Sequence, residues 1–292
     1  MREELFKNCT LCPRKCNVNR LEGKRGYCGM DSTIRAARAA LHMWEEPCIS
    51  GKKGSGAVFF SGCGLRCCFC QNRDIAIGDS GKEISVERLG EIFMELQEKG
   101  AAHYVPHIIS ALELARGKGM NLPVVYNSSG YESVETIRRL DGYVDVYLPD
   151  MKYMEPELAA AFSNARDYPQ AAQSAIAEMM RQTGPCQFAE DGYIKRGTIV
   201  RHLILPGHTK NSIAVLKYLY RTYGEDIFIS VMNQYTPVWK NEKFPELNRK
   251  VTRREYEKVL DAAIELGIEN GYFQEGETAE ESFIPAFDYE GV

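Results

Sequence analysis

Short apolar runs alternate with amphipathic stretches along most of this 292-residue chain. The runs that are brief and rich in β-branched or aromatic residues predict strands at residues 58–60, 123–126, 144–148, 199–205 and 227–232. Apolar positions at helical spacing predict helices at residues 86–99, 106–115, 134–140, 155–183, 213–223 and 253–266. Ser85 is the expected cap of the first of these helices. Strands that alternate with helices predict an α/β fold with a parallel sheet.

The alternation fails at one place, because only Gly100, Ala101 and Ala102 separate the first two predicted helices. A strand needs about five residues. A parallel barrel would place its second strand here, so we expect that strand to be missing or shortened. The chain lacks it, forms it from residues that we assign to a helix, or has lost a segment.

Composition limits the classes of function. The chain is 44% hydrophobic, and it has neither an apolar run of membrane-spanning length nor a charged-then-apolar leader, which predicts a soluble cytoplasmic protein with no membrane partner. A formal net charge of −4 gives no broad attraction to nucleic acid. Such a length allows one large or two ordinary domains, and we predict a cysteine-rich segment with its lead-in at 1–50 and the barrel at 51–292.

Three cysteines, Cys63, Cys67 and Cys70, directly follow the apolar run at 57–60 in the order Cys-x3-Cys-x2-Cys. Three thiolates hold three corners of a cubane iron–sulfur cluster and leave one iron open to a small molecule, whereas four leave none. A zinc knuckle or a buried group of reduced thiols is the alternative, although zinc sites usually take four ligands. Cys68 lies inside the motif, and we interpret it as a bystander because adjacent side chains in a tight loop point in different directions.

The first thirty residues form a second cysteine-rich segment with little apolar periodicity, in which Cys9, Cys12, Cys16 and Cys28 are interleaved with proline and glycine. Such a segment cannot bury a core by itself, so we expect it to fold around a metal site. A structural zinc ion or an auxiliary iron–sulfur cluster fits this spacing, and general frequency favours the zinc-like structural role. Ten cysteines in a reducing compartment favour metal ligation over disulfides.

With Phe69 just before its last cysteine, the motif resembles the signature of the radical S-adenosylmethionine (SAM) superfamily. The resemblance implies a [4Fe–4S] cluster whose open iron binds the amine and carboxylate of SAM. One electron then enters the sulfonium and breaks a carbon–sulfur bond, and the resulting 5′-deoxyadenosyl radical abstracts hydrogen. The cofactor supplies this chemistry, and the protein mainly positions it.

Further segments resemble the pyruvate formate-lyase activating enzymes, most closely relatives with an N-terminal cysteine segment, at residues 9–16, 42–51, 59–72, 127–131, 148–152 and 200–207. This resemblance implies a partial (β/α)6 barrel with its catalytic groups at the carboxyl ends of the strands, where parallel barrels place ligands. It also implies hydrogen abstraction from a glycine Cα, hence a protein or peptide substrate, and an electron donor such as flavodoxin or ferredoxin. Relatives with the cysteine segment could act on other substrates.

The same resemblance implies a set of cofactor-binding residues. Asp150 and Lys152 would lie near SAM, and two positions apart on one strand end they face the same side, although a surface ion pair is the alternative. Arg201 would bind the SAM carboxylate, which suits an arginine fork. Asn127 and Ser129 would hydrogen-bond the cofactor or form a turn with Gly130.

Weaker positions complete this set. Phe69 and Asn72 belong to the matching segment around the cysteines, and Gln234 follows the sixth strand. His42 is expected to be a core histidine. In the superfamily a Gly-Gly-Glu-like segment at the end of the second strand binds the SAM amino group, and no equivalent lies between Lys99 and His103. A non-catalytic iron–sulfur protein that carries electrons or binds a partner is therefore the rival hypothesis.

Overall fold

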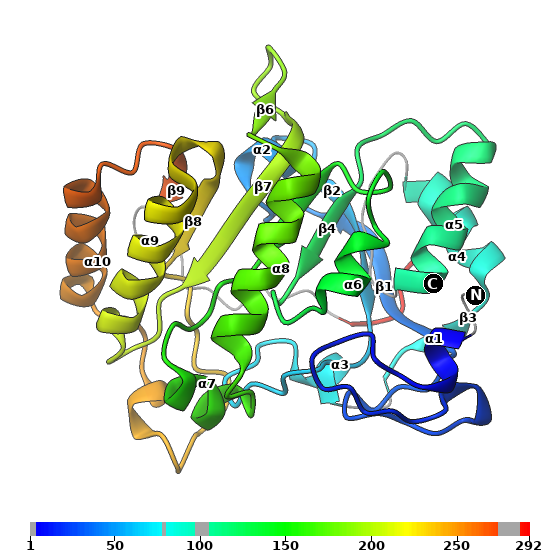
Figure 1. The fold of residues 1–292 in the computed structure, drawn as a ribbon, viewed down its shortest axis with the longest axis horizontal. Helices are drawn as coiled ribbons and strands as arrows, with labels where there is room; N and C mark the ends of the chain where they lie inside the picture. The colour runs from blue at the N-terminus through cyan, green and yellow to red at the C-terminus, as the bar shows by residue number, and fades with distance from the viewer. Residues whose placement is uncertain (1–3, 78–79, 97–104, 274–286) are drawn as a thin grey trace.

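The computed structural model describes residues 4–77, 80–96, 105–273 and 287–292, and its central element is a parallel sheet (Figure 1). Its strands lie in the order β4-β5-β7-β8-β9. They span Val125–Ser128 (β4), Val146–Pro149 (β5), Ile194–Leu203 (β7), Phe228–Met232 (β8) and Gly271–Phe273 (β9). Four of these strands overlap the predicted runs, and the α/β fold with a parallel sheet is confirmed.

Two strands of this sheet region were not predicted. The two residues of β6, Gln187–Phe188, pair antiparallel with the start of β7 and form a hairpin that projects from the amino end of the sheet (Figure 1). Strand β9 has three residues and adds to β8 in parallel. Both strands are too short to give a periodic signal.

Helices connect the strands, and their bounds are close to the predicted ones. They span Val86–Glu95 (α4), Val105–Gly117 (α5), Val134–Arg138 (α6), Pro156–Ser163 (α7), Tyr168–Thr183 (α8), Thr209–Tyr223 (α9) and Arg253–Leu266 (α10), with shorter helices at Glu4–Lys7 (α1), Pro47–Ser50 (α2) and Arg73–Ile77 (α3). The Ser85 side chain accepts a hydrogen bond from the Arg88 backbone N–H, so the predicted cap of α4 is confirmed.

The long helical region predicted over 155–183 is divided into α7 and α8. Helix α7 ends because Asn164, its C-cap, adopts the left-handed conformation with φ 52°, which asparagine tolerates better than most residues. A proline in the first turn of α8, Pro169, suits a new helix start, where the missing N–H costs no hydrogen bond. The break matters for the site because it turns the end of α7 toward the cysteine loop.

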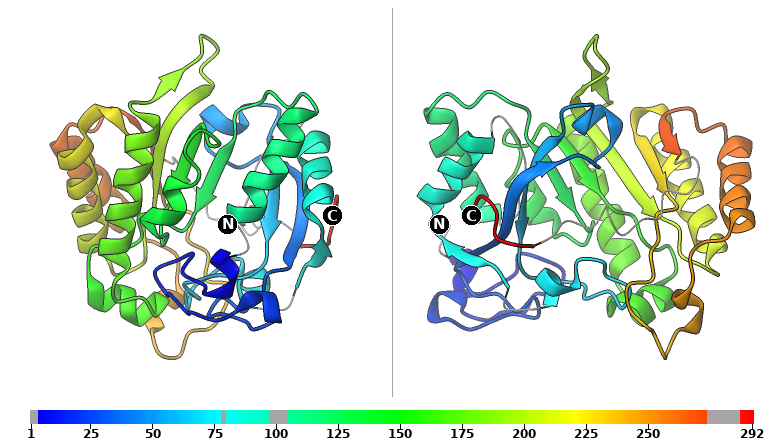
Figure 2. Two further views of the ribbon diagram at one scale, coloured as in Figure 1. Left: turned by 45° about the vertical axis from the view of Figure 1, so that its right-hand side comes forward. Right: turned by 180° about the vertical axis from the view of Figure 1, so that it is seen from behind.

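A second sheet with the order β2-β1-β3 lies beside the first (Figure 2). Its strands span Ile34–His42 (β1), Ser55–Phe60 (β2) and Lys82–Ile84 (β3), and β1 runs antiparallel to both others. The sequence predicted β2 but not β1, because four of the nine residues in β1 are alanines, which have low strand propensity. Residues of the chain end lie along β1, where the Ala39 N–H donates to the Glu290 carbonyl at 2.8 Å.

The strand expected between the first two helices falls at residues 97–104, outside the described residues. Among the residues that are described, β2 does not share a hydrogen-bonded ladder with β4. The predicted boundary near residue 50 stays a prediction, although β1 before it and β2 after it belong to one sheet. No helix within the described ranges is long and apolar enough to cross a membrane.

The two ends of the parallel sheet carry different structures. The loop after β2, helices α3 and α7 and the N-terminal segment lie at the end toward which β7 points, whereas α2 and the β6 hairpin lie at the opposite end (Figure 1). Cys48 of α2 packs with apolar residues of β5 and β7 in a small buried cluster, Val146, Leu148, Ile194 and Ile199. Helix α2 therefore closes the amino end of the sheet and leaves the carboxyl end for the site.

Candidate functional site

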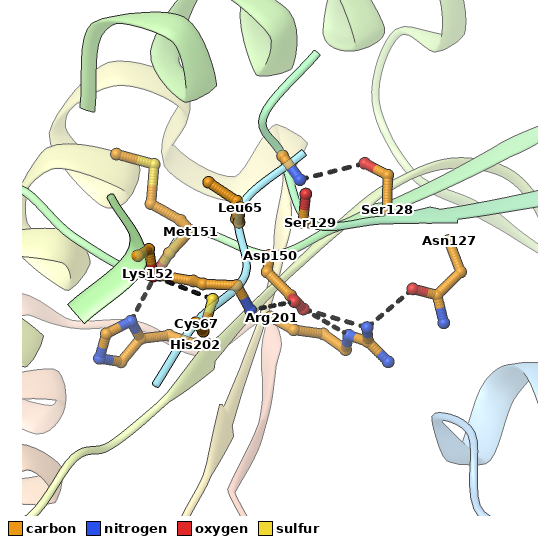
Figure 3. Close-up of polar contacts among 12 residues, drawn as sticks. Leu65, Cys67, Asn127, Ser128, Ser129, Asp150, Met151, Lys152, Arg201 and His202 are labelled. Carbon is orange, nitrogen blue, oxygen red and sulfur yellow. Dashed lines mark hydrogen bonds and ion pairs between the residues drawn. The ribbon is translucent and has the colours of Figure 1, made fainter. Parts of the chain in front are cut away.

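Three polar side chains from three neighbouring strands meet at the carboxyl end of the sheet (Figure 3). Asp150 directly follows β5 and forms a parallel bridge with Arg201 of β7. The Arg201 guanidinium donates to the Asp150 carboxylate at 3.1 Å from Nε and lies 3.0 Å from it at Nη2. Nη2 also donates to the Asn127 side-chain oxygen on β4 at 2.8 Å. The strand register thus brings together three of the predicted site residues.

Lys152 joins this group from the same strand end as Asp150. Its ammonium lies 2.5 Å from the Asp150 carboxylate, and both side chains are about one-sixth exposed (16% and 15%). Burial would raise the pKa of Asp150, but the Lys152 and Arg201 charges outweigh it and hold the pKa below its usual value. Burial would lower the pKa of Lys152, but Asp150 and Cys67 raise it, so the amine stays protonated. The pair is a buried feature of the site, not a surface ion pair.

Two acidic residues that sequence analysis did not assign to the site also reach this group. Glu45 accepts hydrogen bonds from the Asn127 amide at 3.2 and 3.3 Å and lies 3.5 Å from Arg201. Glu46 is 9% exposed, and burial raises its pKa. Both residues come from the turn before α2, at the other end of the sheet. The signal available in the sequence was the Glu-Glu-Pro at 45–47, which lies within the segment 42–51 but has no evident role by itself.

The Tyr168 hydroxyl fixes the backbone beneath the charged group. It lies 2.8 Å from the Asp150 carbonyl and 2.9 Å from the Ser129 carbonyl, and it accepts a hydrogen bond from the Lys152 N–H at 2.9 Å. Ser129 therefore contributes through its carbonyl. Gly130 has φ +74°, and a Cβ there would lie 2.2 Å from the Asp150 carbonyl oxygen. Only glycine allows this approach.

The three predicted cluster ligands lie on the loop after β2. The Ser163 hydroxyl at the end of α7 donates to Cys67 Sγ at 2.9 Å, and the Trp239 indole N–H donates to the Cys70 carbonyl at 3.1 Å. Burial raises the pKa of Cys67 to about 12. The nearby Cys63 also raises this pKa, whereas the positive charge of Lys152 lowers it. Cys67 and Lys152 are thus close enough to influence each other, so the cysteine loop and the polar group share one site (Figure 3).

The donor set of this loop suits a thiolate-bound group. In the described part of the chain, no three Cys, His, Asp or Glu side chains converge closely enough to hold a metal ion as they stand. Three thiols on one short loop nevertheless match a cluster by ligand type and number. Burial raises the pKa of Cys70 to about 11, so binding of a cluster would have to release protons from these thiols.

The weaker predicted positions lie around this loop. Phe69 is buried and packs edge-on against Phe162 and Tyr235, as a core residue would. The Asn72 carbonyl accepts a hydrogen bond from the Ala76 N–H at 3.0 Å and begins α3. The Gln234 amide donates to Met232 Sδ at 3.4 Å. Their assignment to the cofactor stays a prediction.

Cys68 and His42, which were not expected to bind the cofactor, lie beside the site, and His42 is half-buried instead of a core residue. Cys68 hydrogen-bonds Asn241, and its N–H donates to the Phe162 carbonyl at 2.8 Å. His42 packs edge-on against Phe59 with a ring-centroid distance of 5.8 Å, and its Nε2 lies 3.7 Å from Glu45 at the border of the polar group. Burial lowers the pKa of His42.

The N-terminal cysteine segment lies against the cysteine loop (Figure 1). The Tyr27 N–H donates to Cys16 Sγ at 3.2 Å, and Arg20 donates to Cys9 Sγ at 3.8 Å. Burial raises the pKa of Cys12 to about 12, and Cys28 and Cys16 raise it further, so these thiols share one neighbourhood. Which metal they would bind stays open.

The fold and the site define an α/β protein with a cysteine loop and a buried charged group at the carboxyl end of a parallel sheet. No family model matches the chain. It is 29% identical over 274 residues to the uncharacterized protein MJ0674 of Methanocaldococcus jannaschii, covering 89% of this chain and 75% of that protein. It is 27% identical over 113 residues to the pyruvate formate-lyase-activating enzyme of Clostridium pasteurianum, covering 34% of this chain and 46% of that enzyme.

Solved structures give more distant likenesses. SuiB of Streptococcus suis bound to S-adenosylmethionine has a TM-score of 0.46 and 11% identity, covering 73% of this chain and 48% of SuiB. The same protein bound to its precursor peptide SuiA has a TM-score of 0.45 and 12% identity, covering 73% and 46%. The chain therefore matches less than half the length of SuiB and of the Clostridium enzyme.

Proposed function

We propose that this chain is a radical SAM enzyme that holds a [4Fe–4S] cluster through Cys63, Cys67 and Cys70. The observation that carries the proposal is that the two halves of the site lie side by side: Cys67, from the loop after β2, is next to Lys152, from the end of β5 (Figure 3). A cluster on the loop would therefore face the charged group. Local similarity to a pyruvate formate-lyase-activating enzyme supports the same assignment.

The chain's own residues would bind and orient SAM. Bound together, cluster and SAM supply a radical that abstracts hydrogen. Lys152 and Asp150 offer a cation and an anion for the ribose hydroxyls or the methionyl carboxylate. Arg201 can receive that carboxylate by releasing Glu45, the more distant of its two acidic partners at 3.5 Å against 3.0 Å for Asp150.

The substrate that we propose is a glycine or another residue of a protein or peptide, and the electron donor is a small carrier such as flavodoxin or ferredoxin. The support is the partial match to the Clostridium activating enzyme, which covers 46% of that protein. All ten cysteines lie within the described residues and are free, as metal ligation in a reducing cytoplasm requires. The N-terminal cysteines would hold zinc or an auxiliary cluster.

Electron paramagnetic resonance of anaerobically reconstituted, dithionite-reduced protein tests the proposal, followed by chromatography for 5′-deoxyadenosine. We expect a cluster signal that changes when SAM is added, and 5′-deoxyadenosine that disappears in Cys63→Ala. Cys68→Ala is the matched control, because this thiol hydrogen-bonds Asn241 and should leave both readouts intact. A signal that ignores SAM, with no cleavage, would instead favour the non-catalytic electron-transfer or binding protein.

A further inference from the structure

Arg14 lies between the N-terminal cysteine segment and the cysteine loop. Its Nε donates to the Gly64 carbonyl at 2.8 Å, directly beside Cys63, and its Nη2 donates to the Ser163 carbonyl at 3.3 Å. One guanidinium thus holds two backbone positions, 50 and 149 residues away in sequence. Only the planar fork of arginine can reach both in a fixed geometry.

Aromatic rings fix the position of this guanidinium. It lies 4.1 Å from the centre of the Tyr27 ring and 5.2 Å from the centre of the Tyr131 ring. Arg66 of the cysteine loop lies 4.7 Å from the same Tyr27 ring. Cation–π contacts on more than one ring restrict the side chain further than its hydrogen bonds alone would. Arg14 therefore cannot move without disturbing both the segment and the loop.

The two cysteine-bearing regions also pack closely at two glycines of the loop. A Cβ placed on Gly64 would lie 3.7 Å from Cys12 Sγ, and one on Gly62 would lie 3.1 Å from the Cys28 carbonyl oxygen. The two glycines flank Cys63. The N-terminal segment is thus packed against the residues on both sides of the first ligand position of the loop, with the Met30 side chain also against Gly62.

Ser163 connects Arg14 to Cys67. This residue is fully buried, its carbonyl accepts from Arg14, and its hydroxyl donates to Cys67 Sγ. The Tyr153 hydroxyl lies 2.7 Å from the Ser163 hydroxyl. Because the Ser163 proton is directed to sulfur, Tyr153 is the donor to Ser163. A donor to a ligand sulfur stabilises the more negative, reduced state of a cluster and raises its reduction potential.

We infer that Arg14 is a positioning residue that couples the N-terminal cysteine segment to Cys67 through Ser163. This inference rests on the proposed function, because the potential that it concerns belongs to the proposed cluster. Cys12 and Cys16 each lie two residues from Arg14 in the chain, so the backbone that carries these cysteines also places Arg14. The segment thereby adjusts the reduction potential of the cluster.

A redox titration of the reconstituted protein, followed by electron paramagnetic resonance, tests the coupling. Arg14→Gln and Ser163→Ala should each shift the cluster potential to more negative values. Arg14→Gln/Ser163→Ala should shift it by less than the sum of the single shifts, because both act along one path. Arg14→Lys keeps the charge but loses the fork, so it should recover part of the shift. Lys24→Gln, which removes an exposed cation of the same segment, should match the unsubstituted protein.

Alkylation of the apoprotein gives a readout that needs no cluster. Cys67 is 8% exposed, and we expect Arg14→Gln to make its reaction with iodoacetamide several-fold faster, whereas Lys24→Gln does not. If the unsubstituted protein assembles no cluster, the proposed function is wrong. The alkylation rates still show whether Arg14 positions the residues around Cys67. If Arg14→Gln does not fold, Arg14→Lys replaces it in both measurements. Unchanged potential and unchanged alkylation in a folded Arg14 variant would overturn the inference.

Discussion

The charged group at the strand ends and the N-terminal cysteine segment are held in different ways. Asn127, Asp150 and Arg201 are placed by a regular parallel ladder. The register of this ladder fixes where each of the three side chains starts. Within the described residues, the cysteine segment is attached by side-chain bonds to carbonyls and by stacked cations. Many backbone hydrogen bonds together maintain the geometry of a ladder, whereas a few side-chain contacts hold the segment in place.

This difference separates two tasks within one site. Rigid strand ends suit the orientation of a cofactor, because a catalytic arrangement tolerates little displacement. A segment held by few contacts can open locally, because the loss of one contact changes its position. We therefore expect substitutions in the charged group to affect stability of the whole fold, and substitutions at the segment to affect local opening.

Arg201→Leu should give the largest effect. It leaves the Asp150 and Glu45 carboxylates without their shared cation, and removal of one partner from a buried ion pair costs roughly 3–5 kcal/mol. Denaturant unfolding measures this loss. Lys195→Leu on the same strand, at an exposed position, is the control and should be nearly neutral. A small effect of Arg201→Leu would mean that the strand ends are no more rigid than the segment.

Gly130→Ala should follow, with a loss of about 3 kcal/mol from a positive φ and a Cβ placed against the Asp150 carbonyl. Gly142→Ala isolates the backbone effect, because Gly142 has φ +80° and nothing within 4 Å of the added Cβ. We expect about 1 kcal/mol there. Equal losses in the two variants would show that the close approach at Asp150 contributes nothing.

The sequence predicted much of the strand-end group because the family resemblance pointed to these residues, while periodicity located the strands whose carboxyl ends gather at one edge. Asn127, Asp150 and Lys152 follow predicted strands, Arg201 lies within one, and the structure brings them together. Their role toward SAM, like that of the cluster cysteines, stays a prediction.

Other contacts had no local signal. Glu45 meets Arg201 across 156 residues and Ser163 meets Cys67 across 96, so only tertiary packing creates these contacts. Strand β1 was missed because its alanines lack strand propensity, and the division of α7 from α8 depends on the single left-handed Asn164.

His202, next to Arg201 but with its Nδ1 against the Met151 carbonyl at 2.6 Å, gives a prediction on pH. Burial lowers its pKa to about 4, so the folded protein binds fewer protons than the unfolded chain below the ordinary value near 6.5. Its contribution to stability is complete above pH 6.5 and is lost as the pH falls toward 4. We expect a loss of about 2 kcal/mol between pH 7 and pH 5. Unfolding of His202→Asn across this range should lack that component, and an identical pH dependence would contradict the assignment.

Thr136→Val should give the smallest effect, confined to the segment. The Thr136 hydroxyl of α6 donates to the Leu11 carbonyl at 2.8 Å, next to Cys12, and loss of such a bond costs about 1 kcal/mol. That free energy corresponds to about five-fold more local opening, which iodoacetamide alkylation of Cys12 in the apoprotein would detect. Thr222→Val removes a hydroxyl that donates to the Tyr218 carbonyl within α9 and is the control. If both variants alkylate alike, or if Thr136→Val lowers the global free energy of unfolding instead, the segment opens only with the whole fold, and the contrast with the strand ends disappears.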